Sequence, residues 1–180
     1  MADDTKLSSS VTVRRYNELV RAGDRRALSR FVIERFEERY FRPVEDSPSK
    51  HGFTSMAIGC LTIETLESFY QGRPDTRRVS AQMFRSFFER DTPLKVFGGD
   101  GDWFYRDIRC GVLHQAEARG GWRIRRGGPL LDAAARTINA TIFLREVRRA
   151  VGAYAKELEF DDQCWMRFQR KMQAVCTNCA

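Results

Sequence analysis

The sequence lacks any long apolar run. No stretch approaches the roughly 18 consecutive apolar residues of a membrane helix, so we expect no membrane segment. The first ten residues are polar and lack the apolar core of a secretory signal peptide. We therefore expect a cytoplasmic protein with one domain over residues 11–175 and a disordered N-terminus over residues 1–10.

Cysteine is present, but not in the arrangement of a disulfide framework or a metal site. The five cysteines are an odd number and are scattered along the chain. Cys176 and Cys179 form a CxxC pair, yet no second pair and no histidine pair stands near them to complete a tetrahedral zinc site. We expect reduced thiols, a C-terminal tail over residues 176–180, and neither a metal nor a cofactor.

Lysine is scarce, and arginine supplies most of the positive charge. The formal net charge is +7, and only five of the 31 basic residues are lysines. Because a guanidinium group holds phosphate through two parallel hydrogen bonds, this balance is compatible with an anionic partner such as nucleic acid. A solvated, arginine-rich surface with no such partner explains the composition equally well.

Apolar residues at helical spacing predict an all-α fold. The expected helices cover residues 13–22, 24–40, 53–70, 79–90, 102–117, 132–158 and 161–174, with a loop at 43–52. Helix 53–70 is apolar on most sides and should be central. Glycines bound an alternating segment at residues 121–127, which predicts a short strand or hairpin arm. The sequence thus predicts a bundle of about six or seven helices with a small β-like excursion.

The expected helix 102–117 has two unusual faces. The residues that should face the core are Phe104, Ile108, Gly111 and Val112. The opposite face carries Trp103, Cys110 and Leu113, which a solvent-exposed helix rarely presents. We therefore expect this helix to form the interface of a homodimer.

Arg109 and His114, five residues apart, lie on this helix. On a straight α-helix they are about 140° apart, so they should not meet as an i,i+4 pair does. If they act together, either Gly111 lets the helix distort or a second copy supplies the partner. Histidine can take a proton from a ribose 2′-hydroxyl or give one to a leaving 5′-oxygen, and arginine can hold the scissile phosphate. This pair is sufficient for RNA cleavage without a metal.

An all-helical basic domain with Arg-x4-His late in a helix resembles the HEPN superfamily. The resemblance covers roughly residues 53–158 and rests on the segment Phe104-Tyr-Arg-Asp-Ile-Arg-Cys-Gly-Val-Leu-His-Gln-Ala-Glu117. It implies a four- or five-helix core that dimerises, and a metal-independent endoribonuclease of the toxin–antitoxin or defence type. Arg109 and His114 match the catalytic positions. Cys110 stands where active members often have Asn, Asp or His, and Ala116 replaces the tyrosine of members controlled by nucleotidylation.

Other residues could support this chemistry. Glu64, Cys110 and Glu117 are candidates for orienting the catalytic pair. The candidate RNA-binding residues are Arg106, Arg119, Trp122, Arg123, Arg125 and Arg126. Residues 119–128 hold four arginines, one tryptophan and no acid, which is typical of a flap that binds single-stranded RNA. The same segment could be an ordinary hairpin with Trp122 packed on the bundle.

Each site residue also has a structural interpretation. His114 could bond a neighbouring carbonyl group, and Arg109 could simply pair with Glu64 or Glu67. His51 lies in a polar loop and should be exposed. The alternative function is a non-catalytic helical dimer that binds nucleic acid, a nucleotide or a regulatory partner such as a cognate antitoxin. Convergence of Arg109 and His114 from two copies on an open cleft would favour the enzyme.

Overall fold

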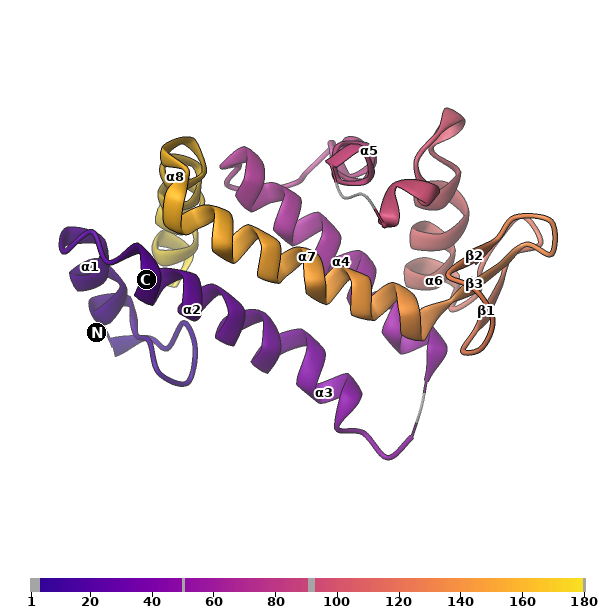
Figure 1. Cartoon of the computed structure of the whole chain (residues 1–180), viewed down its shortest axis with the longest axis horizontal. Helices are drawn as coiled ribbons and strands as arrows, with labels where there is room; N and C mark the ends of the chain where they lie inside the picture. Colours follow the sequence, from indigo (N-terminus) through magenta and orange to yellow (C-terminus); the bar gives the residue numbers. More distant parts are fainter. Residues whose placement is uncertain (1–3, 50, 91–92, 180) are drawn as a thin grey trace. The chain divides into compact units, whose positions relative to one another are not determined.

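The computed structural model describes residues 4–49, 51–90 and 93–179 and is mostly helical, with one small sheet (Figure 1). Its α-helices are α1 (Val13–Arg21), α2 (Arg25–Phe36), α3 (Arg42–Glu45), α4 (Gly52–Gln71), α5 (Ser80–Arg90), α6 (Cys110–Gln115), α7 (Ala140–Phe160) and α8 (Asp162–Asn178). No helix among the described residues has the length and apolar character needed to cross a membrane. The all-α prediction is confirmed.

Most predicted helices occur where the periodicity placed them, with two changes near α2. Asp24 caps α2 by accepting a hydrogen bond from the backbone of Ala27, as its position before the apolar pattern indicates. The helix then widens into a π-helix, Glu37–Phe41, and continues as α3. The loop expected at residues 43–52 is therefore shorter than predicted, because the continuous helix runs through Pro43 to Glu45.

The chain divides into two compact units. The first contains the described residues of Met1–Pro43, Ser68–Asp75 and Val151–Ala180, and the second contains Val44–Glu67 and Thr76–Ala150. Both α4 and α7 contribute residues to each unit. A single domain over residues 11–175 stays a prediction.

Aromatic rings fill the core of the first unit. Phe69 is its centre: its ring centroid lies 6.2 Å from that of Phe36, 6.1 Å from that of Tyr154 and 6.0 Å from that of Phe168. All four side chains are buried. Asp161 caps the last helix by accepting a hydrogen bond from the backbone of Cys164, which agrees with the helix start expected at residue 161.

The N-terminal segment is folded, contrary to the expected disorder. Leu7 is fully buried, and its carbonyl oxygen accepts hydrogen bonds from Arg35 and Arg39. Ser9 and Ser10 donate hydrogen bonds to the carboxylate of Glu34 on α2. The prediction is therefore wrong for residues 4–10. Long-range contacts to α2 and the adjoining π-helix hold this segment in place, although its own sequence has few apolar residues. Residues 1–3 lie outside the described residues.

The prediction of a loose C-terminal tail is also wrong. Helix α8 continues to Asn178, beyond the end expected at residue 174, so Cys176 is helical. The backbone N–H of Cys179 donates to the carbonyl oxygen of Cys176 at 3.1 Å, which closes the last turn. Polar residues after 174 obscured the helical continuation in the sequence. Ala180 lies outside the described residues.

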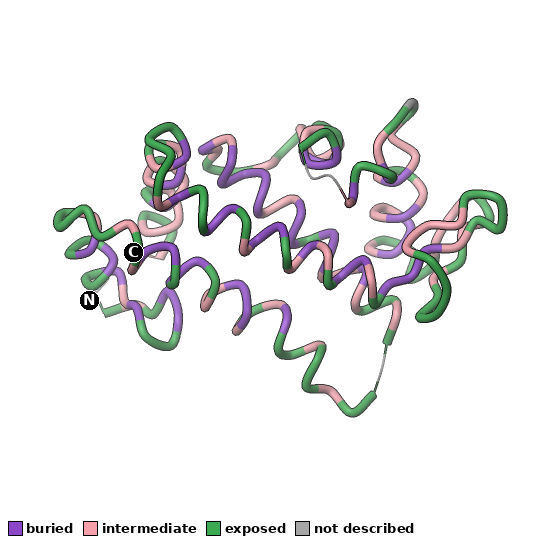
Figure 2. Tube along the Cα trace, in the orientation of Figure 1, coloured by how far each residue is buried: buried purple, intermediate pink, exposed green. Residues whose placement is uncertain are grey.

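A second aromatic core belongs to the second unit. Phe104 lies 5.0 Å from Phe88, 5.0 Å from Phe97 and 5.5 Å from Phe143, measured between ring centroids. These four rings are at most 2% exposed. Figure 2 shows buried and exposed residues alternating along the helices, as expected for helices with one face against a core. Phe104 thereby anchors the segment that carries the candidate site.

A three-stranded sheet occupies the region where one strand was expected. Strand β1 (Arg123–Arg125) pairs in parallel with β3 (Thr137–Asn139), and β2 (Leu131–Asp132) pairs with β3 in antiparallel orientation. The short strand at 121–127 is confirmed, but its partner is β3, so it is not one arm of a local hairpin. The long helix predicted from residue 132 begins only at Ala140, because residues 131–139 join the sheet.

The expected helix 102–117 is divided into shorter pieces. A short 3-10 turn, Asp100–Asp102, leads into a π-helix, Phe104–Arg109, which is followed by α6. The chain reverses at Ala116, which has a left-handed conformation. A Cβ atom on Gly111 would lie 2.5 Å from the Glu117 carbonyl oxygen, so only glycine fits under the returning chain. The residues predicted to face the core are all buried: Phe104, Ile108, Gly111 and Val112.

Candidate functional site

Arg109 and His114 meet within one chain. The Nη1 atom of Arg109 lies 3.3 Å from Nε2 of His114. The expectation that they could not touch without helix distortion at Gly111 or a second copy is wrong. The π-helix ends at Arg109, and the residues from Cys110 to His114 follow ordinary α-helical winding, so the long arginine side chain alone spans the rotation and reaches the imidazole.

This contact constrains the imidazole. Arginine has only N–H donors and cannot accept a hydrogen bond. The contact is therefore a hydrogen bond only when Nε2 of His114 carries no proton and Nδ1 does. His114 is exposed to solvent, so an incoming molecule can reach the imidazole. In this tautomer the one lone pair of Nε2 is occupied by the Arg109 N–H, so Nε2 can accept a proton from another molecule only once that contact opens.

A hydrogen-bond network on the buried side of the site holds the second terminal nitrogen of the Arg109 guanidinium group. Nη2 of Arg109 donates to Oε2 of Glu64 at 3.0 Å, and both side chains are at most 15% exposed. The other carboxylate oxygen, Oε1, accepts hydrogen bonds from Oγ1 of Thr76 and from Oγ of Ser80, each at 2.7 Å. We refer to Glu64, Thr76, Ser80 and Arg109 as the Glu64 cluster. It fixes the direction in which the guanidinium group points.

The cluster keeps its two charges. Burial by itself would raise the pKa of Glu64, but hydrogen bonds from Ser80 and Thr76 and the charge of Arg109 bring that pKa below its ordinary value. Burial would lower the pKa of Arg109, and the charge of Glu64 outweighs it, so that pKa lies above its ordinary value. The two groups therefore stay ionised together near neutral pH.

An aromatic ring and two thiols surround the arginine. The guanidinium carbon of Arg109 lies 5.4 Å from the centroid of the Tyr105 ring, within the range of a cation–π contact. Burial, followed by the neighbouring Cys110, raises the pKa of Tyr105. Burial also raises the pKa of Cys60, which is fully buried. The Cys60 thiol is therefore protonated and does not act as a nucleophile.

The chain matches no family model, no curated protein and no solved structure. The interpretation of the site therefore rests on its geometry and on the chemistry of its residues. Among the described residues, no group of three or more His, Cys, Asp or Glu side chains is arranged to hold a metal ion.

Of the proposed supporting residues, Glu64 and Cys110 both interact with Arg109, Glu64 through an ion pair and Cys110 through a side-chain hydrogen bond that helps to raise the pKa of Arg109. Cys110 is half-buried beside Tyr105. Glu117 is exposed, and its carboxylate accepts a hydrogen bond from the backbone of Ala118. None of the contacts among the described residues brings Glu117 to Arg109 or His114. The predicted Arg109–Glu64 alternative is confirmed, whereas Glu67 instead pairs with Arg90 at 2.9 Å.

The residues expected to bind RNA lie on a second surface. We call residues 119–128 the arginine loop. Arg123, Arg125 and Arg126 are exposed, and none of them forms an ion pair with a described residue. Arg119 is less exposed and donates to the Gln115 side chain at 2.9 Å. Contacts within the described part of the chain do not join this loop to Arg109 or His114.

Trp122 packs against the helix, as its structural interpretation required. Its ring lies 4.3 Å from that of Trp103, with an interplanar angle of 19°. A groove of about 460 Å³ lies beside this pair and is also lined by Arg106 and Arg136. Both tryptophans remain partly exposed. Trp103, which was expected to need a partner subunit, is thus covered in part by its own chain.

Sequence reasoning missed Thr76, Ser80 and Tyr105. Thr76 and Ser80 lie at the start of α5, where hydroxyl groups are ordinary helix-capping residues. A signal existed, because Glu64 in an otherwise apolar helix must find hydrogen-bond donors when it is buried. Nothing in the spacing indicated which donors they would be.

Proposed function

We propose that the protein is a HEPN-like, metal-independent endoribonuclease. The observation that carries the proposal is the contact between Arg109 and the exposed His114 imidazole, with Arg109 held from behind by Glu64. It places a fixed positive charge beside a group that can accept a proton. These are the two requirements for cleaving RNA by attack of its own 2′-hydroxyl.

The proposed reaction uses the two side chains in different roles. Nη1 of Arg109 binds a non-bridging oxygen of the scissile phosphate and neutralises the charge that grows there. When Nη1 turns from His114 to the phosphate, the lone pair of Nε2 is freed and takes the proton of the 2′-hydroxyl, whose oxygen attacks the adjacent phosphorus. The bond from phosphorus to the 5′-oxygen breaks, and that oxygen takes up a proton from an imidazolium, which a second copy would supply. The products are a 2′,3′-cyclic phosphate and a 5′-hydroxyl. Glu64 is a positioning residue for Arg109.

The arginine loop provides the proposed RNA-binding surface. Its exposed arginines attract phosphates, and a base can stack on the remaining face of the tryptophan pair, Trp103 and Trp122. The proposal includes a cytoplasmic location, a homodimer formed through residues 102–117 and a cognate antitoxin or regulatory protein as partner. The half-buried Cys110 and Leu113 support the dimer, since an interface would cover the rest of them.

His114→Ala tests the chemistry, and His51→Ala is its matched control. His51 is the other histidine of the chain and is also exposed. His114→Ala should reduce cleavage of single-stranded RNA by roughly 10²- to 10⁴-fold with RNA affinity nearly unchanged, whereas His51→Ala should cleave normally. The assay is run with EDTA, and the product ends are identified as cyclic phosphates. Unchanged cleavage by His114→Ala, or a strict need for magnesium, would contradict the mechanism.

Replacing Arg123, Arg125 and Arg126 together by glutamine tests the RNA surface. RNA affinity should fall, and the slope of log affinity against log salt should decrease by about 0.7 for each single-strand phosphate that the variant no longer neutralises. The control replaces Arg21, Arg26 and Arg30, three exposed arginines of the first unit, and should leave the slope unchanged. Cleavage of RNA that is already bound should continue in both variants. An equal loss of affinity in both would point to net charge alone.

A non-catalytic binding module is the second candidate. It is favoured by the burial of Arg109, whose side chain is only 15% exposed and already bonded to Glu64. A wild-type protein that binds RNA but leaves every tested RNA intact would select this function. In that case His114→Ala and wild type would be indistinguishable in binding.

A further inference from the structure

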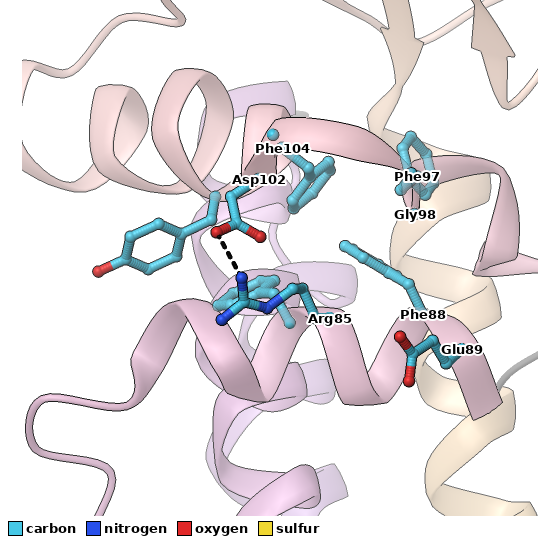
Figure 3. A pocket seen from close by; sticks show the side chains of 11 residues that line it. Arg85, Phe88, Glu89, Phe97, Gly98, Asp102 and Phe104 are labelled. Atoms are coloured by element: carbon cyan, nitrogen blue, oxygen red, sulfur yellow. Dashed lines mark hydrogen bonds and ion pairs between the residues drawn. The ribbon is translucent and has the colours of Figure 1, made fainter.

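A pocket outside the candidate site opens between α5 and the segment that follows it. Its volume is about 430 Å³, within the range of small-molecule sites. Figure 3 shows phenylalanine rings on one side, with Arg85 and Asp102 facing each other at the other side. All its lining residues belong to the second unit. None of them takes part in the proposed proton transfer.

The apolar side of the pocket is aromatic and preformed. The ring of Phe88 lies 5.7 Å from that of Phe97 and 5.0 Å from that of Phe104, and these side chains are fixed in the core. Each of these rings is at most 2% exposed, so together they give the pocket a rigid apolar floor of small area. A planar heterocycle can therefore enter without displacing a side chain from the core.

The polar side presents a donor beside an acceptor. Nη1 of Arg85 donates to Oδ2 of Asp102 at 3.1 Å, and the side chains are 56% and 28% exposed. Within the part of the chain that the structure describes, this is the one bond that either side chain makes. The remaining guanidinium N–H groups and Oδ1 of Asp102 can thus bind a ligand. Glu89, four residues after Arg85 on α5, adds a second carboxylate to the pocket.

The third wall is bare backbone. Gly99 and Gly101 have φ angles of 116° and 83°, which side-chain-bearing residues rarely adopt. A Cβ atom added at either position would meet no atom within 4 Å, so the space beside this loop is open. A flat molecule can lie close to the peptide groups there.

We propose that this pocket binds a guanine base. Guanine presents adjacent N1–H and N2–H donors, which a carboxylate can accept, and the O6 and N7 acceptors, which arginine recognises. Asp102 takes the first pair, and Arg85 takes the second. Adenine places an amino group where guanine has O6. The amino N–H and the guanidinium N–H groups of Arg85 are all donors, so no hydrogen bond could form there. The base rests on the small area that the Phe88 and Phe104 rings leave uncovered.

The guanine can come from a free nucleotide or from RNA. Tyr105 lines the pocket, and the guanidinium group of Arg109 lies 5.4 Å from the Tyr105 ring, so the pocket adjoins the candidate site. A guanine held here would place the RNA backbone close to Arg109. The RNA source rests on the proposed function, whereas binding of a mononucleotide does not.

In the first test the whole protein is titrated separately with guanosine 5′-monophosphate and with adenosine 5′-monophosphate. Binding is measured by calorimetry and by the NMR shifts of the glycine amides. Guanosine monophosphate should bind at least about fivefold more tightly than adenosine monophosphate. Its addition should shift the Gly99 and Gly101 resonances. Asp102→Asn and Arg85→Gln should each weaken guanosine monophosphate binding by roughly 5- to 100-fold, and Arg30→Gln should not. Asparagine tolerates the left-handed conformation of Asp102, so the first variant keeps the loop folded.

The outcomes separate the pocket from the nuclease. No saturable binding of guanosine monophosphate, equal affinity for the two nucleotides, or wild-type affinity in both pocket variants would overturn the proposal, whether or not RNA is cleaved. Guanine-selective binding without RNA cleavage supports the pocket and assigns it to a free nucleotide. Tighter binding of an oligonucleotide with one guanine than of its guanine-free counterpart, abolished in Asp102→Asn, supports the pocket and assigns it to RNA.

Discussion

Two glutamates, one in each unit, accept hydrogen bonds from hydroxyl groups in a similar way but have different structural roles. In the first unit, Oε1 of Glu34 accepts from Oγ of Ser9 and from the backbone nitrogen of Ser10, each at 2.9 Å, and Oε2 accepts from Oγ of Ser10 at 2.6 Å. In the second unit, Thr76 and Ser80 donate to one oxygen of Glu64. Only Glu64 also holds an arginine.

The difference shows what converts a structural tether into a candidate site. Serine donors compensate the Glu34 charge, and the result is an N-terminal segment fixed to α2. At Glu64 the second oxygen is left for Arg109, which extends the network outward to the exposed His114. A carboxylate that accepts hydrogen bonds only from hydroxyl and backbone donors holds two segments of the chain together, as Glu34 does. The same carboxylate with a guanidinium group positions a charge for chemistry.

Acidification should have the largest effect, because it reaches both carboxylates. Hydrogen bonds from Ser10 and Ser9 outweigh burial and lower the pKa of Glu34 from 4.5 to about 2, and the pKa of Glu64 is also lowered. Groups with a depressed folded pKa stabilise the fold above the unfolded value and lose this contribution as the pH falls through the folded value. The free energy of unfolding should therefore decrease from about pH 4.5 to about pH 2. Urea unfolding at a series of pH values measures it.

Glu64→Gln should have the next largest effect. The variant keeps an acceptor for the hydroxyl groups but leaves Arg109, 15% exposed, without its counter-charge. Breaking such a pair from one side should cost about 2–3 kcal/mol. Denaturant unfolding gives this value, with Glu117→Gln, an exposed carboxylate, as the control. Equal stability of Glu64→Gln and wild type would remove the distinction drawn between the two glutamates.

Glu34→Gln should reduce the free energy of unfolding by less, about 1 kcal/mol, because it leaves no buried charged group without its counter-charge. The loss should be local: hydrogen exchange should accelerate at the amides of Ser9 and Ser10, while the amides of α6 remain protected as in wild type. The pH dependence below 4.5 should become shallower in this variant. A loss as large as that of Glu64→Gln would mean that the arginine adds nothing.

The smallest effects should come from single hydroxyl groups. Ser80→Ala and Ser10→Ala should each reduce the free energy of unfolding by about 0.5–1 kcal/mol, with the half-buried Ser80 at the upper end. Thermal unfolding followed by circular dichroism can rank the two. In addition, Ser80→Ala should lower RNA cleavage under the proposed function, whereas Ser10→Ala should not. A reversed order would show that burial of the hydroxyl does not decide the cost.

The helices could be predicted because their signals are local. Apolar spacing and capping residues such as Asp24 and Asp161 located α2 and α8 closely at their starts. The sheet could not be predicted in full, since residues 131–132 and 137–139 are too short to show a strand period and β1 pairs with β3, which does not follow it directly in the chain. Asn139 held a usable signal: its side chain accepts from the backbone of Thr141 and Ile142 and so marks the true start of α7.

The site could be predicted in its members but not in its contacts. Arg109, His114 and Glu64 were singled out because their chemistry is unusual for their surroundings. The contact between Arg109 and His114 depends on how far the arginine side chain extends across the helix surface, which backbone periodicity does not describe. The π-helical winding before Arg109 could not be predicted either, because no residue in it indicates the change.

That turn also sets how tolerant the chain is of length changes. A π-helical turn holds about one residue more than an α-helical turn, so residues 104–109 contain, in effect, an inserted residue that the helix has absorbed. Deleting one residue between Phe104 and Arg109 should therefore let the turn close as ordinary α-helix, with the segments on either side keeping their present phase. Phe104 would stay among the buried rings, and Arg109 would stay beside Glu64. A single-residue deletion should be tolerated better here than in the regular helix α6, where it would rotate the flanking residues by about 100°. The exposed tip at residues 126–129 should also tolerate length changes.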